Sequence, residues 1–171
     1  MDENLDLKVD SIRALFESGE TGRFAGALEG MRAPDAAEVL TSLPWEIQVP
    51  LFKSMEQEMA SEVLTLVDEG IARDILELLT IDEIVPLIDF MASDDATDII
   101  NYHDSDTAGA VLRRITREDY EDVSELLNFD EESAGGLMAR ELVTVRAGKS
   151  ISDVIDTLRS ELDSIEHIQY I

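Results

Sequence analysis

The chain contains no cysteine and only two histidines among its 171 residues. Without thiols it has no disulfide framework, no thiolate metal site and no cysteine nucleophile. Its apolar runs are only a few residues long, far below the ~18 residues that a membrane-spanning helix requires. The opening residues, MDENLDLKVD, lack the basic and apolar regions of a signal peptide. We therefore expect a soluble intracellular chain.

Basic side chains are also scarce, because 13 Lys and Arg face 39 Asp and Glu, for a net charge of -26. A surface of this charge repels nucleic acid and anionic membranes, so we expect neither a nucleic-acid partner nor direct membrane insertion. Cations or a basic protein surface are its natural complements. Adaptation to a salty cytoplasm is the alternative explanation of the acidity.

Motifs of known catalytic or nucleotide-binding loops are missing from the sequence. The two histidines, His103 and His167, lie far apart, and His103 falls on an apolar stripe where a hydrogen-bonded core imidazole is expected. Gly135 and Gly136 follow no predicted strand and precede no Lys-Ser or Lys-Thr pair, which favours a backbone bend over a phosphate-binding loop. The sequence thus predicts that the protein is not an enzyme.

A twelve-residue pattern occurs eight times between Ala36 and Leu127. Each copy has a small or apolar residue, an apolar pair three and four positions later and another apolar residue at the seventh, as in Ala36, Val39, Leu40 and Leu43. These offsets share one face of an α-helix. Helices of about two turns are unstable alone and must bury this face against their neighbours. The pattern predicts a mainly α, superhelical array of either hand, with a compact all-α bundle as the alternative.

The regions on both sides of the repeats lack the twelve-residue pattern. Residues 1–32 predict two capping helices, the repeats occupy 33–128, a junction covers 129–141, and 142–171 form an incomplete α/β unit. In this unit we expect a strand at 142–145, a helix opened by a capping box of Ser150 and Asp153, and a second strand at 167–171. Four prolines are expected near helix starts: Pro34, Pro44, Pro50 and Pro86.

Carboxylates recur one position before the apolar pair in five of the eight repeats. We call these five residues the acidic ridge and expect them along one side of the array: Glu38, Glu62, Asp74, Asp98 and Asp122. Asp94 shares a helix face with Asp98, and like charges at this spacing are destabilising unless a cation lies between them. A solvated surface is the ordinary interpretation, whereas the sharper one is a site for a hard cation such as Mg²⁺ or Ca²⁺. Spacing alone leaves both open.

The segment FDEESAGGLM, residues 129–138, followed by ELVTV at 141–145, resembles the junction between the N domain and the CBS domains of MgtE-type magnesium transporters. The preceding repeats are similar to the superhelical N domain of that family. The resemblance implies an N domain at 1–128 and an incomplete CBS motif at 142–171. It also implies a cytosolic regulatory region in which Mg²⁺, held between N-domain and CBS carboxylates, keeps a transport gate closed.

Two short motifs carry the implied ion ligands. Residues 60–63 match the family's Ala-Ala-Glu-Val and residues 94–98 its Asp-Asp-x-Ala-Asp, so the resemblance implies Mg²⁺ ligands at Glu62, Asp94 and Asp98, with Asp95 as a further candidate. Thr97 replaces an alanine of that pattern and is expected at the surface.

The resemblance also implies partners and a location. The partners are the chain's own CBS and transmembrane domains and a second copy in a full-length homodimer. The location is the cytoplasmic face of the cell membrane. An interaction scaffold that resembles flagellar motor switch proteins, with no ion role, is the alternative.

Overall fold

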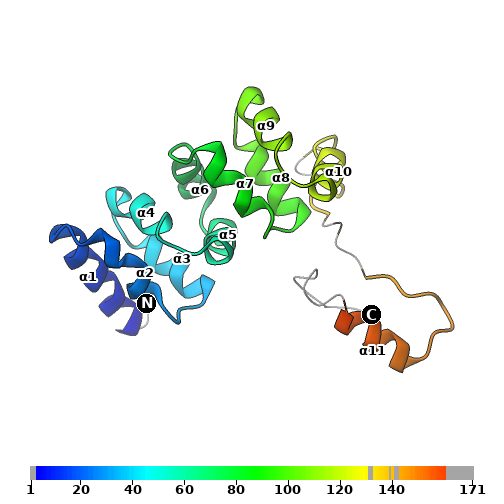
Figure 1. Ribbon diagram of the computed structural model, residues 1–171, viewed down its shortest axis with the longest axis horizontal. Coiled ribbons are helices and arrows are strands. Elements are labelled where there is room, and N and C mark those ends of the chain that lie inside the picture. The colour runs from blue at the N-terminus through cyan, green and yellow to red at the C-terminus, as the bar shows by residue number, and fades with distance from the viewer. Residues whose placement is uncertain (1–2, 131–132, 139, 141–142, 161–171) are drawn as a thin grey trace.

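The computed structural model describes residues 3–130, 133–138, 140 and 143–160, and Figure 1 shows their arrangement. Their regular structure is entirely helical, and no described helix is long and apolar enough to cross a membrane. The helices are α1 Glu3–Glu17, the 3-10 helix η1 Thr21–Arg23, α2 Phe24–Leu28, α3 Ala33–Thr41, α4 Trp45–Phe52, α5 Gln57–Leu66, α6 Glu69–Leu76, α7 Ile81–Ile88, α8 Ser93–Asn101, α9 Ser105–Leu112, α10 Arg117–Leu126 and α11 Ile151–Ser160.

The helices α3 to α10 begin 12 residues apart, from Ala33 to Arg117, and so confirm the repeat. The predicted stripe is buried, as Val39 and Leu40 show with 0% exposure. Tyr120 departs from it with 46% exposure. The reason is its place on α10, the last helix of the array, where no further repeat covers it.

Most helices of the array pack on the helix after the next one, while α4 also packs on its neighbour α3. Along one side α3 packs on α5, α5 on α7 and α7 on α9, and along the other α4 packs on α6 and α8 on α10. The guanidinium of Arg73 on α6 lies 4.3 Å from the ring centre of Tyr102, which follows α8 directly, and so joins these two helices. We call α3, α5, α7 and α9 the odd stack, and α4, α6, α8 and α10 the even stack. Together they form the elongated array of Figure 1.

The N-terminal helices close the first end of the array. α1 packs on α2 and α3, where Lys8 donates to the carbonyl of Ala27 at 2.7 Å and Arg13 to that of Ser42 at 3.2 Å. Gly19, with φ of 74°, allows the turn that follows α1. The two helices predicted within residues 1–32 are therefore present.

The proline prediction is correct at two positions and wrong at two. Pro34 lies in the first turn of α3 and Pro44 is the N-cap of α4. Pro50 and Pro86 lie inside α4 and α7. Each is the sixth residue of an eight-residue helix, beyond the first turn, so each lacks the N–H that would bond to the carbonyl four residues earlier.

The C-terminal region confirms one of its predicted elements. Ser150 and Asp153 form the predicted capping box, with the Asp153 carboxylate 3.1 Å from the Ser150 amide and the Ser150 hydroxyl 3.2 Å from the Asp153 amide. α11 follows and stands away from the array in Figure 1. The strand predicted at 142–145 is absent from residues 143–145, because a strand needs a ladder partner and no described residue supplies one. The second predicted strand, 167–171, lies outside the described residues.

Candidate functional site

Helix α8 carries three of the four predicted ion ligands. Asp94 and Asp95 belong to its first turn and are half-buried, and Asp98 follows one turn later and is exposed. Carboxylates are stabilised at this end of a helix by the partial positive charge of the free N–H groups. The helix places Asp94 and Asp98 on one face, as the spacing predicts.

One oxygen of this pair has an unusual environment. Oδ1 of Asp94 is buried and has no hydrogen-bond partner within the described part of the chain. Burial of a carboxylate oxygen without a compensating contact disfavours the folded state. A divalent cation would supply that contact, and Mg²⁺ takes carboxylate oxygens as ligands. Asp94 and Asp98 are therefore suited to supply part of the ligand set of a Mg²⁺ site.

Glu62 lies elsewhere in the array. It is exposed on α5, in the odd stack, whereas the aspartates belong to α8 in the even stack. Across the described ranges no three Asp, Glu or His side chains gather closely enough to hold a metal ion. The structure thus brings Asp94 and Asp98 together but does not join Glu62 to them in one cluster.

The acidic ridge is divided between the two stacks. Glu38 and Glu62 lie on α3 and α5, while Asp74, Asp98 and Asp122 lie on α6, α8 and α10. The prediction of one ridge along one side is therefore wrong. Successive repeats alternate between the stacks, so equivalent positions form two rows.

Thr97 is buried, with 4% exposure, which corrects the expectation of a surface position. Its hydroxyl donates to the carbonyl of Ser93 at 2.6 Å, one turn earlier in α8. Ser93 is itself 4% exposed. The side of α8 that carries Ser93 and Thr97 is thus part of the core, and the helix is fixed in rotation about its axis.

A contact that the sequence did not predict lies beside this turn. Arg140 donates its backbone N–H to the Ser93 hydroxyl at 3.0 Å, and its Nε lies 3.0 Å from Oδ1 of Asp122 on α10. The chain reaches this point through a turn in which the amide of Gly136 donates to the carbonyl of Ser133 at 3.1 Å. This turn confirms the predicted bend at Gly135 and Gly136. The only sequence signal for Arg140 is its isolation as a cation in an acidic stretch.

His103 is half-buried after α8, and its Nε2 is buried without a hydrogen-bond partner among the described residues. Burial lowers its pKa below the usual 6.5, and the nearby Asp104 carboxylate opposes this shift. The prediction of a hydrogen-bonded core imidazole is therefore wrong in two respects, because the ring is only half-buried and Nε2 has no hydrogen-bond partner among the described residues.

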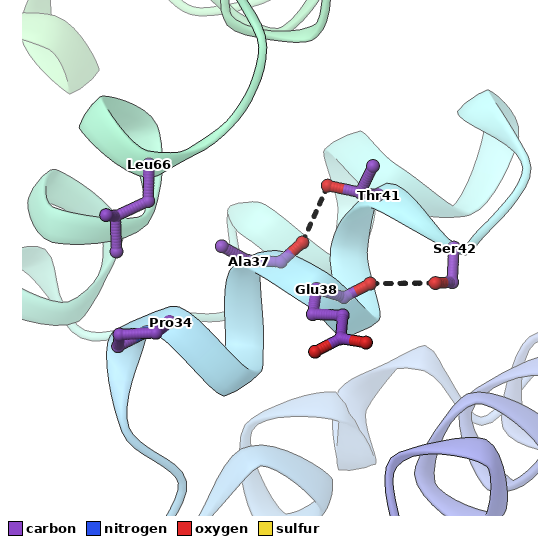
Figure 2. A pocket seen from close by; sticks show the side chains of 6 residues that line it. All are labelled: Pro34, Ala37, Glu38, Thr41, Ser42 and Leu66. Carbon is purple, nitrogen blue, oxygen red and sulfur yellow. Dashed lines mark hydrogen bonds between the residues drawn. The ribbon is translucent and has the colours of Figure 1, made fainter. Parts of the chain in front are cut away.

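Two hollows open on the surface of the array. The first, about 300 Å³, lies between α3 and the end of α5, where Figure 2 shows Leu66 opposite Pro34. The hydroxyls of Thr41 and Ser42 in its wall donate to carbonyls of their own helix at 2.7 and 2.8 Å. The second, about 280 Å³, lies beside α7 and includes Lys53 and Glu83. Neither hollow is lined by a predicted ion ligand, so neither is assigned as the site.

The arrangement of helices agrees with known proteins. The family model of the MgtE intracellular N domain matches residues 31–132. The fold is similar to the cytosolic domain of the Mg²⁺ channel MgtE, solved in complex with ATP, with a TM-score of 0.81 and 22% identity over 94% of this chain and 66% of that one. It is also similar to the soluble part of a magnesium transporter, with a TM-score of 0.78 and 17% identity over 96% of this chain and 65% of that one.

The chain therefore spans just under two thirds of the length of these two structures, 66% and 65%. No protein of curated function matches its sequence. The matched residues 31–132 contain all eight helices that begin at twelve-residue intervals, and all four predicted ligands lie inside them.

Proposed function

Because the chain belongs to the family of MgtE intracellular N domains, we propose that it is the cytosolic Mg²⁺-sensing region of a magnesium channel or transporter. Asp94 and Asp98 are the first ligands in this proposal, Glu62 is a ligand on the odd stack, and Asp95 is a further candidate. The observation that carries the proposal is the buried Oδ1 of Asp94, which has no hydrogen-bond partner in the described chain and lies one turn from Asp98 on the same face.

The remaining ligands come from outside the described residues. Mg²⁺ requires about six oxygen ligands, and the face of α8 supplies only two carboxylates. We propose that the CBS domains of the same protein supply the rest, with water. An ion bound between two acidic surfaces stabilises the arrangement in which they meet, and its loss leaves them to repel each other. The net charge of -26 makes this repulsion strong in the absence of cations.

The proposal also covers partners and location. The partners are the protein's own CBS and transmembrane domains and a second copy in a full-length homodimer, at the cytoplasmic face of the membrane. The chain has a regulatory role and no enzymatic one. The descriptions of the two similar structures, a cytosolic domain of a Mg²⁺ channel and a soluble part of a magnesium transporter, support this placement.

The test is a Mg²⁺ titration of the 171-residue chain, followed through the backbone amide signals of α8 in NMR spectra. We expect the amides around Asp94 and Asp98 to shift, with millimolar affinity because the ligand set is partial. Asp94→Asn and Asp98→Asn should each weaken the response at least about fivefold, since each removes a charged ligand. Glu62→Gln should leave the α8 signals unchanged and remove any separate response at α5.

Asp10→Asn is the matched control, because it removes one exposed carboxylate from α1 at the opposite end of the array. Equal responses of Asp98→Asn and Asp10→Asn would exclude α8 as a sensor. A titration without any shift at α8 would do the same.

One observation favours an interaction scaffold as a second candidate. Leu66, Leu78 and Phe90 hold the same position in consecutive repeats and are 51%, 54% and 49% exposed. Because successive repeats alternate between the stacks, Leu66 at the end of α5 and Phe90 just after α7 belong to the odd stack, whereas Leu78 follows α6 in the even stack. Large apolar side chains that recur along one stack are a feature of protein-binding faces. The same titration separates the two functions, because a scaffold without an ion role leaves the α8 amides unshifted.

A further inference from the structure

Arg140 connects two helices of the even stack. Its Nε lies 3.0 Å from Oδ1 of Asp122, and its Nη1 contacts Glu125, so one guanidinium pairs with two carboxylates of α10. Its backbone N–H donates to Ser93 Oγ at 3.0 Å, in the first turn of α8 and 47 residues earlier in the chain. A single residue therefore contacts both helices.

The pair of Arg140 with Asp122 is better shielded from water than the exposed ion pairs of the array, whereas Glu125 is itself 58% exposed. The side chains of Arg140 and Asp122 are 30% and 32% exposed, whereas Arg32, in its pair with Asp35, is 80% exposed. Shielding strengthens an ion pair because water screens it less, and the guanidinium can bond both carboxylates at once. We expect the Arg140–Asp122 pair to be stronger than an ordinary surface ion pair.

A tight turn between α10 and Arg140 precedes these contacts. After α10, the amides of Gly136 and Leu137 both donate to the carbonyl of Ser133 at 3.1 Å, which closes a tight turn. Gly135 lies so close to the ring of Phe129 that a Cβ at this position would be 2.5 Å from it. The turn precedes Arg140, whose backbone lies at the first turn of α8.

Asp122 holds the repeat position that Asp98 holds on α8, and α8 and α10 pack on each other. On α10 this position is already neutralised by a cation of the chain itself. On α8 the equivalent carboxylate belongs to the face with the buried Oδ1 of Asp94.

We propose that Arg140 is a built-in counter-ion that fastens the chain after α10 to α8 and α10 without any metal. We call its contacts with Asp122, Glu125 and Ser93 the Arg140 clasp. The clasp fixes the direction in which the chain leaves the array relative to Asp94 and Asp98. Its importance for ion sensing rests on the proposed function, while the clasp itself does not.

The test measures hydrogen exchange of single amides by NMR, in EDTA, on the 171-residue chain. In Arg140→Gln we expect the amides of residue 140 and of the turn at Gly136 and Leu137 to exchange about tenfold faster, as for the loss of a charge-assisted, partly shielded contact. Amides of α5 should be unchanged. Ser93→Ala should accelerate the amide of residue 140 and leave the turn protected, because the ion pairs remain.

Arg32→Gln is the matched control, since it removes an exposed arginine from an ion pair at the other end of the repeats. Arg140→Lys should restore only part of the protection, because an ammonium lacks the fork that bonds two carboxylates. The clasp would be overturned if the amides of residue 140 and of the turn exchanged at the same rate in Arg140→Gln as in the parent chain. It would also be overturned if Arg32→Gln accelerated these amides as much as Arg140→Gln does.

The two proposals fail in different ways. If Arg140→Gln accelerates hydrogen exchange and Mg²⁺ causes no shift of the α8 amides, the clasp is supported and the sensor is excluded. If Arg140→Gln leaves hydrogen exchange unchanged, and Mg²⁺ shifts the α8 amides in the parent chain but not in Asp98→Asn, the sensor is supported and the clasp is excluded.

Discussion

Nζ of Lys53 lies 2.8 Å from Oε1 of Glu83 and joins the end of α4 to the first turn of α7. The other oxygen of Glu83 accepts from the amide of Thr80 at 2.8 Å and from its hydroxyl at 2.9 Å. The Glu83 carboxylate thus completes the N-terminal cap of α7 and links the two stacks. The hydrogen bond from Lys53, followed by those from Thr80, lowers the pKa of Glu83 from 4.5 to about 2.

Glu83 should therefore make stability depend on acid. Its pKa is lower in the folded chain than in the unfolded one, so its charged form stabilises the fold above pH 4.5, and this contribution is lost as the pH falls toward about 2. Glu83→Gln should lower the free energy of unfolding at neutral pH by no more than about 1 kcal/mol, since the pair is partly exposed. The deficit should shrink between pH 4.5 and about 2 in urea denaturation measured across that range.

Glu58→Gln, at an exposed position in the first turn of α5, is the control for loss of a helix N-terminal charge. A deficit for Glu83→Gln that stays constant down to the lowest pH measured would contradict the assigned role of Glu83.

Neighbouring leucines of α5 should differ strongly in their contribution to stability. Leu64 is 1% exposed and Leu66 is 51% exposed. Leu64→Ala should cost about 3 kcal/mol because it leaves a cavity in the core, whereas Leu66→Ala should cost less than about 1 kcal/mol. Urea denaturation of both variants provides the measurement. Similar costs at the two positions would show that α5 is rotated relative to this structure.

Gly135→Ala should be destabilising through Phe129, because the added Cβ would lie 2.5 Å from its ring. Displacement of the ring should cost on the order of 1 kcal/mol, as overpacking commonly does. In a Phe129→Ala background the same substitution should cost almost nothing, so a double-mutant cycle of thermal unfolding isolates the contact. Equal costs in both backgrounds would place the ring elsewhere.

Ser61 should stabilise the odd stack through one hydrogen bond. Its hydroxyl is buried on α5 and donates to the carbonyl of Leu87 on α7 at 3.0 Å. Ser61→Ala should lower the free energy of unfolding by about 1 kcal/mol. Ser54→Ala is the control, because the Ser54 hydroxyl bonds only locally, to the carbonyl of Leu51 at 2.7 Å. A smaller effect for Ser61 than for Ser54 would argue against the contact between the helices.

The local structure was predictable because it depends on local periodicity. The offsets within each repeat identified the helices, and the apolar pairs such as Val39 and Leu40 are buried as expected. The Ser150 capping box was predictable for the same reason, since both of its residues lie within one turn. The strand expected at 142–145 is absent from its described residues, 143–145, because a strand depends on a partner elsewhere in the chain.

The arrangement of the candidate site was harder to predict. Glu62 and Asp98 have the same repeat position, and only the packing of alternate helices reveals that they belong to different stacks. Thr97 was misplaced because its polarity indicates a surface position, while its hydroxyl is satisfied inside α8. The contact of Arg140 with Ser93 spans 47 residues and leaves no periodic signal.

Because successive helices alternate between the stacks, the smallest segment that can be inserted or deleted without moving later helices to the other stack is 24 residues, or two successive helices. Duplication or deletion of such a pair would lengthen or shorten both stacks and keep each surface continuous. Insertion of a single 12-residue helix would instead transfer every later helix to the opposite stack. Natural variation in the length of this array should therefore occur in steps of helix pairs.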